Sequence, residues 1–78
     1  TMSEGTPKHY QLKIEPVVYI VENEMNFQDG NMIKYASRHR QKDGAKDVLK
    51  AIHYGIITLK EVYKVADIEI RDAINELI

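Results

Sequence analysis

Residues 30–54 read GNMIKYASRHRQKDGAKDVLKAIHY, which predicts two helices joined by a polar link at residues 41–44. Each predicted helix carries polar and aromatic side chains spaced three and four residues apart, so that they project from one face. These lines are Asn31, Lys34, Tyr35 and Arg38 on the first helix, and Asp47, Lys50 and Tyr54 on the second. Together they offer cations, hydrogen-bonding groups and aromatic rings, a combination that suits an anionic ligand with a flat ring.

The helix before the link is expected to run from Asn31 to His39 or Arg40, with Asp29 as its cap and a turn over residues 26–30. Its apolar side chains are expected to face inward, which leaves the polar line on roughly the opposite side at about 100° per residue. The inward side chains are Met32, Ile33 and Ala36.

The helix after the link is expected to begin near Ala45, with Asp43 as its cap. Its apolar residues alternate at spacings of four and three, the seam of a helix packed lengthwise against another. The seam consists of Val48, Ile52, Gly55, Leu59, Val62 and Ala66. Because Gly is about 1 kcal/mol less favourable than Ala in a helix, Gly55 predicts close approach by another backbone.

The seam loses its register beyond Tyr63, where Asp67 and Glu69 interrupt the apolar pattern. We therefore expect a break near Ala66 and a further helix to Ile78. One unbroken helix from Ala45 is the alternative, since no Pro intervenes.

A shorter helix is predicted to start at residues 14–16, because Pro16 is tolerated in a first turn and Glu15 complements the positive end of the helix dipole. The β-branched run at residues 17–21 also fits a strand. Residues 1–13 lack periodicity and are expected to form an extended arm carrying His9 beside Tyr10, with a frayed terminus as the alternative. Residues 14–78 then form a single helical domain.

The bulk composition limits the class of protein. Seventy-eight residues allow one domain with a small core, and the absence of Cys removes disulfides as a source of stability, so we expect self-association into a homo-oligomer. A net charge of -1 gives no general attraction for nucleic acid, and no apolar run approaches the roughly 20 residues that span a membrane. We expect a cytoplasmic all-α bundle of three to four helices with an extended N-terminal arm.

The chain has no glycine-rich phosphate loop, so phosphates would be held by side chains. The candidates are Lys34, Arg38, Lys42 and Lys50, of which Arg38 is able to grip two oxygens at once. Tyr10, Tyr35 and Tyr54 are candidates for stacking on a base, and Asp47 for accepting from a sugar hydroxyl or a base edge. No metal site is expected, because the three His residues lack the spacing of helical ligands. The competing interpretation is that these charges are solvated helix faces.

The order of several short motifs resembles a small bacteriophage family, long described as a domain of unknown function, in which a member has been assigned nucleoside monophosphate kinase activity. The matching residues are Pro7-x-His9-Tyr10, Ile14-Glu15-Pro16, Gly30-Asn31-x-Ile33-Lys34-Tyr35-x-x-Arg38, Lys42-x-Gly44 and Asp47-x-x-Lys50-Ala51-x-x-Tyr54. The resemblance covers about Pro7 to Leu59. It departs from the family at Gly55, where such relatives usually carry a bulky apolar residue, and the tail beyond Tyr63 has no counterpart.

The resemblance implies a nucleotide ligand and phosphoryl transfer from ATP or another nucleoside triphosphate to a deoxynucleoside monophosphate, in the cytoplasm of the phage host. It leaves the base preference and any need for Mg open. On this hypothesis the catalytic cations are Lys34, Arg38 and Lys50, and neighbouring subunits contribute cations to the site. The remaining nucleotide-binding roles fall to His9, Tyr10, Glu15, Asn31, Tyr35, Lys42, Asp47 and Tyr54. Two rival functions are a non-catalytic protein that sequesters a nucleotide and a helical protein-interaction module.

Overall fold

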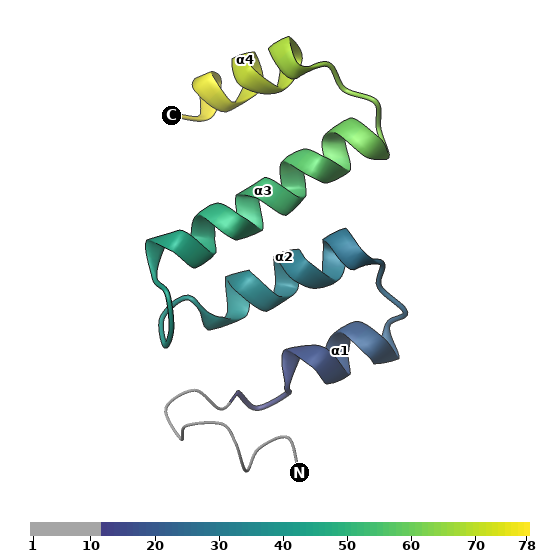
Figure 1. Ribbon diagram of the computed structural model, residues 1–78, viewed down its shortest axis with the longest axis vertical. Coiled ribbons are helices and arrows are strands. Elements are labelled where there is room, and N and C mark those ends of the chain that lie inside the picture. The colour runs from purple at the N-terminus through teal and green to yellow at the C-terminus, as the bar shows by residue number, and fades with distance from the viewer. Residues whose placement is uncertain (1–11) are drawn as a thin grey trace.

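The computed structural model describes residues 12–78, which form four helices and no strand (Figure 1). Helix α1 spans Pro16–Glu22, α2 spans Phe27–Arg38, α3 spans Ala45–Glu61 and α4 spans Asp67–Leu77. The all-α prediction is confirmed, residues 17–21 are helical, and α3 and α4 are separate helices. The predicted N-terminal arm lies almost wholly outside the described residues.

Helix α2 begins four residues earlier than predicted. The side chain of Asn26 accepts a hydrogen bond of 2.8 Å from the backbone N–H of Asp29, which is the geometry of an N-terminal cap. Asp29 therefore lies in the first turn of the helix, where its charge complements the dipole. The predicted turn over residues 26–30 and the predicted cap at Asp29 are wrong, because the cap lies at Asn26.

The start of α3 depends on Gly44 rather than on the predicted cap at Asp43. Gly44 precedes the helix with φ 53° and ψ -127°, a conformation that a residue with a Cβ rarely adopts. No side chain caps this helix. The backbone N–H of Asp43 instead donates a hydrogen bond to Oδ2 of Asp47, with an N–O distance of 3.3 Å. The sharp turn at Gly44 brings α3 back alongside α2.

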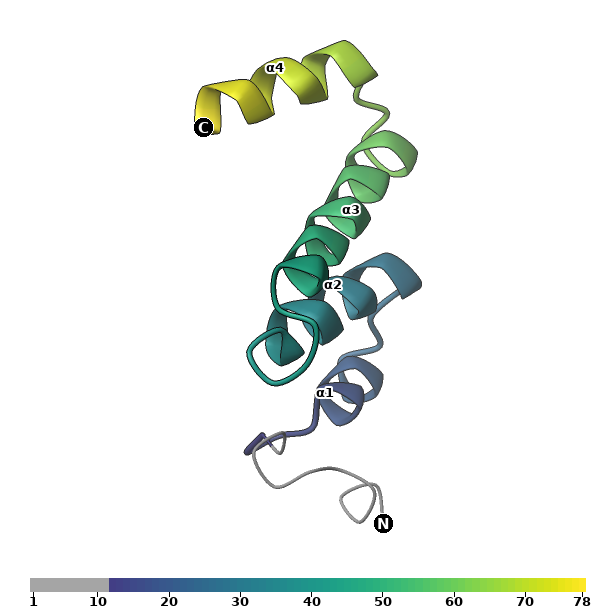
Figure 2. The same cartoon turned by 60° about the vertical axis from the view of Figure 1, so that its left-hand side comes forward.

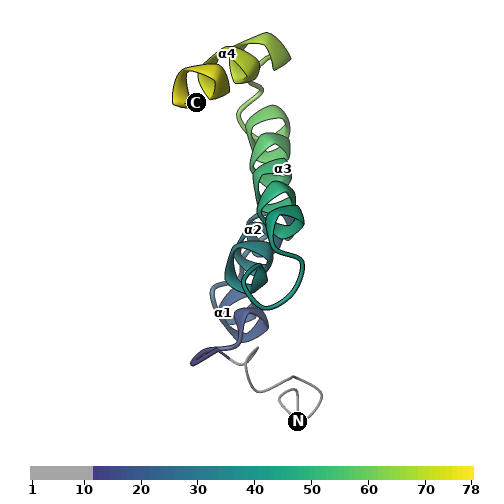
Figure 3. The ribbon, with the colours of Figure 1, turned by 90° about the vertical axis from the view of Figure 1, so that its left-hand side faces the viewer.

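The four helices lie side by side in chain order and form one layer, with α1 and α4 at its two ends (Figures 1 and 2). Seen from the edge, the layer is thin (Figure 3). The overall extents are 45 × 26 × 15 Å, so that the shortest dimension barely exceeds the 10–12 Å diameter of one helix. The radius of gyration of 14.7 Å exceeds the value of about 11–12 Å that a compact chain of this length has.

A single layer buries little apolar surface. Among the described residues the only buried apolar side chain is Ile70, at 5% exposure, and the side chain of Asp47 is completely buried. The predicted inward seam of α3 is wrong: Val48, Ile52 and Leu59 are exposed, because no second layer formed by residues 12–78 covers them. Ala36 of α2 is also exposed, contrary to prediction.

The close approach predicted at Gly55 is found at Gly30 instead. A Cβ built at Gly30 would lie 2.9 Å from Cγ2 of Ile20, so the absence of a side chain there lets α1 pack against α2. A Cβ at Gly55 would meet only the sulfur of Met32, at an ordinary 3.5 Å, and no other backbone. The interpretation of Gly55 is therefore wrong.

Candidate functional site

Two tyrosines join α2 to α3. The rings of Tyr35 on α2 and Tyr54 on α3 are stacked, with centroids 5.9 Å apart and planes inclined by 7°. Both residues are half-buried. The two lines of side chains noted in the sequence therefore meet at these two tyrosines, across the contact between the helices.

Three cations surround the ring of Tyr35. The guanidinium carbon of Arg38 lies 4.6 Å from the ring centroid, and the ammonium nitrogens of Lys50 and Lys34 lie 5.1 and 5.4 Å from it. All three fall within the distance at which a cation is attracted to an aromatic ring. Since Arg38 and Lys50 lie 4.6 and 5.1 Å from one centroid, their charges are less than 10 Å apart. We call Lys34, Arg38 and Lys50 the cation cluster.

One member of the cation cluster is fixed by a carboxylate. The Nε of Arg38 donates to Oδ2 of Asp47 at 3.0 Å, and its Nη2 donates to Oδ1 at 3.1 Å. Such a bidentate pair fixes the orientation of the guanidinium relative to the carboxylate. The side chain of Asp47 is fully buried and that of Arg38 is 14% exposed, so the pair is shielded from water. Asp43 adds a weaker contact, with its carboxylate 3.7 Å from Arg38.

The pKa of Asp47 is lowered from its ordinary value of 3.8, chiefly because the side chain of Arg38 donates hydrogen bonds to the ionised form. Burial acts in the opposite direction. The backbone N–H of Asp43 and the positive charges of Arg38 and Lys50 lower the pKa further. Asp47 is therefore a carboxylate at neutral pH, and its oxygens already accept three hydrogen bonds from the protein.

The two lysines of the cation cluster differ from Arg38 in their carboxylate partners. Within residues 12–78 neither Lys34 nor Lys50 forms an ion pair with a carboxylate. Both come close to the aromatic ring that also attracts Arg38. The cluster therefore gathers three positive charges around one ring, with Asp47 as the only buried counter-charge in the described part of the chain.

The other predicted site residues lie apart from this cluster or are committed elsewhere. Asn31 uses its side-chain amide to donate to the carbonyl of Phe27 at 2.8 Å. Lys42 is exposed in the link between α2 and α3, and Glu15 precedes α1 without an ion pair in the described region. His9 and Tyr10 lie outside the described residues.

Two aromatic residues that the sequence reasoning missed extend the tyrosine stack. Phe27 and His53 each approach Tyr54 edge-on, with ring centroids 5.8 Å away in both cases. Phe27 is 71% exposed, so it forms the solvent-facing end of the aromatic cluster. Recognising Asn26 as a capping residue would have placed Phe27 in the helix, four residues before Asn31.

The described residues contain no group of three or more His, Asp or Glu side chains arranged to hold a metal ion. None of the helices within residues 12–78 combines the length and apolar content needed to cross a bilayer.

The chain was compared with known families, curated proteins and solved structures. A family model described as a protein of unknown function, DUF3310, matches residues 5–55. No curated protein and no solved structure matches the chain. The matched range contains the whole of the cation cluster, Tyr35 and Tyr54, and it ends at Gly55, before the last six residues of α3 and all of α4.

Proposed function

The chain belongs to DUF3310, a family of proteins of unknown function, and we propose that it binds a nucleotide whose phosphates contact the cation cluster. The observation that carries the proposal is the convergence of Lys34, Arg38 and Lys50 on the ring of Tyr35. Lys34 and Lys50 form no ion pair within residues 12–78, so a phosphate group beside them would neutralise positive charge that the described part of the protein leaves unbalanced. Arg38 adds a planar cation that Asp47 holds in place, and the lysines supply mobile point charges.

The arrangement of the rings suggests where a base would lie. Tyr35 is stacked on Tyr54 and flanked by cations, so it offers little free surface for a further ring. Phe27 is the exposed member of the same aromatic cluster. We therefore place the base against Phe27 and the edge of Tyr54, with the phosphates toward Tyr35.

The activity that we propose for this site is that of a nucleoside monophosphate kinase in a bacteriophage. The oxygen of a bound monophosphate would attack the γ-phosphorus of ATP or another nucleoside triphosphate, and the bond to the β-phosphate would break. Such a transfer depends mainly on positioning and on neutralising phosphate charge, which cationic side chains provide without a phosphate loop. Asp47 takes part by holding Arg38 in place, since its own oxygens are already hydrogen-bonded.

Lys50→Ala tests the binding site, with Lys46→Ala as the matched control. Both residues are on α3, but Lys46 is exposed and forms none of the ring contacts that Lys50 makes. A lost hydrogen bond between charged groups costs about 1.5 kcal/mol or more, so Lys50→Ala should weaken the Kd for nucleotides by about tenfold or more. Titration calorimetry with nucleoside mono- and triphosphates measures this, and Lys46→Ala should leave the Kd unchanged. Equal effects of the two substitutions, or no binding by the unmodified protein, would refute the proposal.

Catalysis is tested separately from binding. The protein is incubated with ATP and each deoxynucleoside monophosphate in turn, with and without Mg, and the products are resolved by chromatography. Formation of the deoxynucleoside diphosphate together with ADP establishes the kinase, whereas ADP alone would report only hydrolysis of ATP. Tight binding without product would instead establish the rival function, a protein that sequesters nucleotides.

An interaction module is the second candidate, and the exposed apolar side of α3 favours it. Val48, Ile52 and Leu59 form a stripe along this helix that no part of residues 12–78 covers. Absence of nucleotide binding in the calorimetric titration would favour this function over both nucleotide-based ones.

A further inference from the structure

Among residues 12–78, the layer of helices has two open edges. Helices α2 and α3 each pack between two neighbours, whereas α1 packs chiefly on α2, and α4 chiefly on α3 (Figure 1). The two end helices lie at opposite ends of the molecule (Figure 3). Each therefore has a flank to which another helix could be added.

The edge formed by α1 is apolar. Three exposed valines of the helix recur at intervals of one and three residues, which places them along one flank. They are Val17, Val18 and Val21, and Ile14, which is also exposed, precedes the helix by two residues. The helix has only seven residues and no buried side chain, so its own packing provides little stability.

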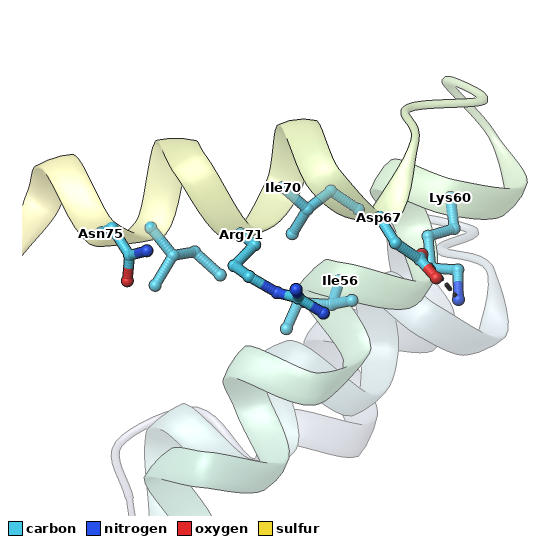
Figure 4. Close-up of a pocket in the computed structure, with 7 residues that line it drawn as sticks. Ile56, Lys60, Asp67, Ile70, Arg71 and Asn75 are labelled. Atoms are coloured by element: carbon cyan, nitrogen blue, oxygen red, sulfur yellow. Dashed lines mark ion pairs between the residues drawn. The ribbon is translucent and has the colours of Figure 1, made fainter.

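The edge formed by α4 contains a groove. It lies between α3 and α4 and has a volume of about 350 Å³. Its apolar lining consists of Ile56, Ile70 and Ile74, which we call the isoleucine floor. Figure 4 shows Ile56 on α3 and Ile70 on α4. Leu49 and Ile52 precede Ile56 by seven and four residues and are exposed, so the apolar floor continues along α3 for two more turns. A groove between two diverging helices suits an amphipathic helix.

Within residues 12–78, the charges left without an ion pair at the groove and at the α1 edge are opposite. Residues 14–33 contain four carboxylates and no Lys or Arg. At the groove, Lys60 is paired with Asp67 at 3.1 Å, and Arg71 has no ion pair within the described residues. At 100° per residue, the remaining carboxylates of α4 lie on the side away from the groove. They are Glu69, Asp72 and Glu76.

We propose that α1 of a second copy of this chain occupies the groove between α3 and α4. The aliphatic flank of α1 covers the isoleucine floor, and Glu22 lies toward Arg71. Pairing of two grooves is disfavoured, because it would bring two copies of Arg71 together, whereas α1 supplies carboxylates. The contact joins unlike surfaces, so copies associate head to tail, either as a closed ring or as an open chain.

A mixing experiment tests this arrangement. Val21→Lys disables the α1 edge and leaves the groove intact, while Arg71→Glu disables the groove and leaves α1 intact. We expect the unmodified protein to sediment above its chain mass of 9.0 kDa and each variant to lose the larger species. An equimolar mixture of the two variants should form a dimer of twice the chain mass, since one intact α1 meets one intact groove.

Controls separate the contact from a general loss of structure. Asp72→Lys reverses a charge on the opposite side of α4 and should leave the sedimentation unchanged. Combining Glu22→Arg with Arg71→Glu should restore the assembly by exchanging the two charges. Circular dichroism reports the helix content of each variant, and Asn75→Lys in the groove replaces Arg71→Glu if the latter loses helicity.

Three outcomes would overturn the proposal. One is a monomeric unmodified protein, and another is an undiminished assembly of Val21→Lys, which would mean that copies meet through some other surface. The third is a mixture of the two folded variants that stays monomeric. None of these results bears on nucleotide binding, because the cation cluster lies on α2 and the first half of α3.

Discussion

Asp47 illustrates how a charged side chain is buried in a protein that has little apolar core. Its carboxylate is inaccessible to water, and each oxygen accepts a hydrogen bond from Arg38. A buried charge is costly unless it is paired and hydrogen-bonded, and here both conditions are met. The pair is thus a structural link between α2 and α3 as well as part of the candidate site.

Asp47→Asn should lower the stability of the protein at neutral pH, because the amide offers Arg38 no negative charge. The pKa of Asp47 is lowered in the folded protein, so its stabilising contribution is fully present above its ordinary value of 3.8 and is lost as the pH falls through the folded-state pKa. The difference in free energy of unfolding between wild type and variant should therefore shrink in acid. Denaturant unfolding at pH 7 and at a pH well below 3.8 measures it.

Asp43→Asn is the control for this experiment. Asp43 is 42% exposed on its side chain and lies 3.7 Å from Arg38, so its charge is screened by water. The substitution should change stability little at either pH. A loss as large as that of Asp47→Asn would contradict the assignment of Asp47 as the main partner of Arg38.

Most residues of the candidate site could be named from the sequence, with the exception of Phe27 and His53, but their surroundings could not. Spacing placed Tyr35 and Arg38 on one line and Asp47 and Tyr54 on another, and the structure brings the two lines together. From the sequence alone, apolar side chains are expected to face inward and charged side chains to face outward. Both lines are therefore predicted to lie at the surface. That rule fails here because the ion pair joins residues nine positions apart on different helices, which periodicity within one helix does not reveal.

At the scale of the helices, Gly30 of α2 and Gly55 of α3 differ in the space that surrounds them. Gly30 is in close contact with Ile20 of α1, and Gly55 has room for a methyl group beside Met32. Helix propensity favours Ala over Gly at both positions by about 1 kcal/mol. Only at Gly30 does a steric clash oppose that gain.

Gly55→Ala should raise the free energy of unfolding by up to about 1 kcal/mol, because the added Cβ meets only an ordinary contact. Gly30→Ala should fail to stabilise the protein, and α1 should separate from α2, since Cβ would lie 2.9 Å from Ile20. Denaturant midpoints of the two variants measure the difference. Equal stabilisation by both substitutions would show that α1 does not pack closely at Gly30.

The helices themselves were largely predictable, whereas the packing of α3 was not. Pro16 and the polar link at residues 41–44 mark real boundaries, and the loss of register beyond Tyr63 marks the break before α4. The start of α2 was missed because Asn26 and Asp29 are both capable caps. The seam of α3 has the spacing of a packed face, yet spacing cannot tell whether a second layer exists to cover it.

At the scale of the whole molecule, stability is expected to be unevenly distributed. Helices α2 and α3 share the tyrosine stack and the ion pair of Arg38, whereas α1 has no buried side chain and α4 has one, Ile70. Local opening requires the least free energy where buried contacts are fewest.

Hydrogen exchange of backbone amides should therefore be slowest in α2 and α3 and fastest in α1, in solutions dilute enough to disfavour association. Mass spectrometry of exchanged fragments measures the order. Uniform protection of all four helices in dilute solution would show that the layer opens as a single unit. Protection of α1 that rises with protein concentration is expected from docking in a neighbouring copy.

The succession of helices, each lying against the next in the chain, also bears on how the protein reaches this shape. Native contacts form between segments separated by short loops, so little loop-closure entropy is lost before they are made. Helical proteins dominated by such local contacts fold in microseconds to milliseconds. The turn at Gly44 allows α2 and α3 to meet first when the whole chain folds, and the outer helices then add to an existing surface one at a time.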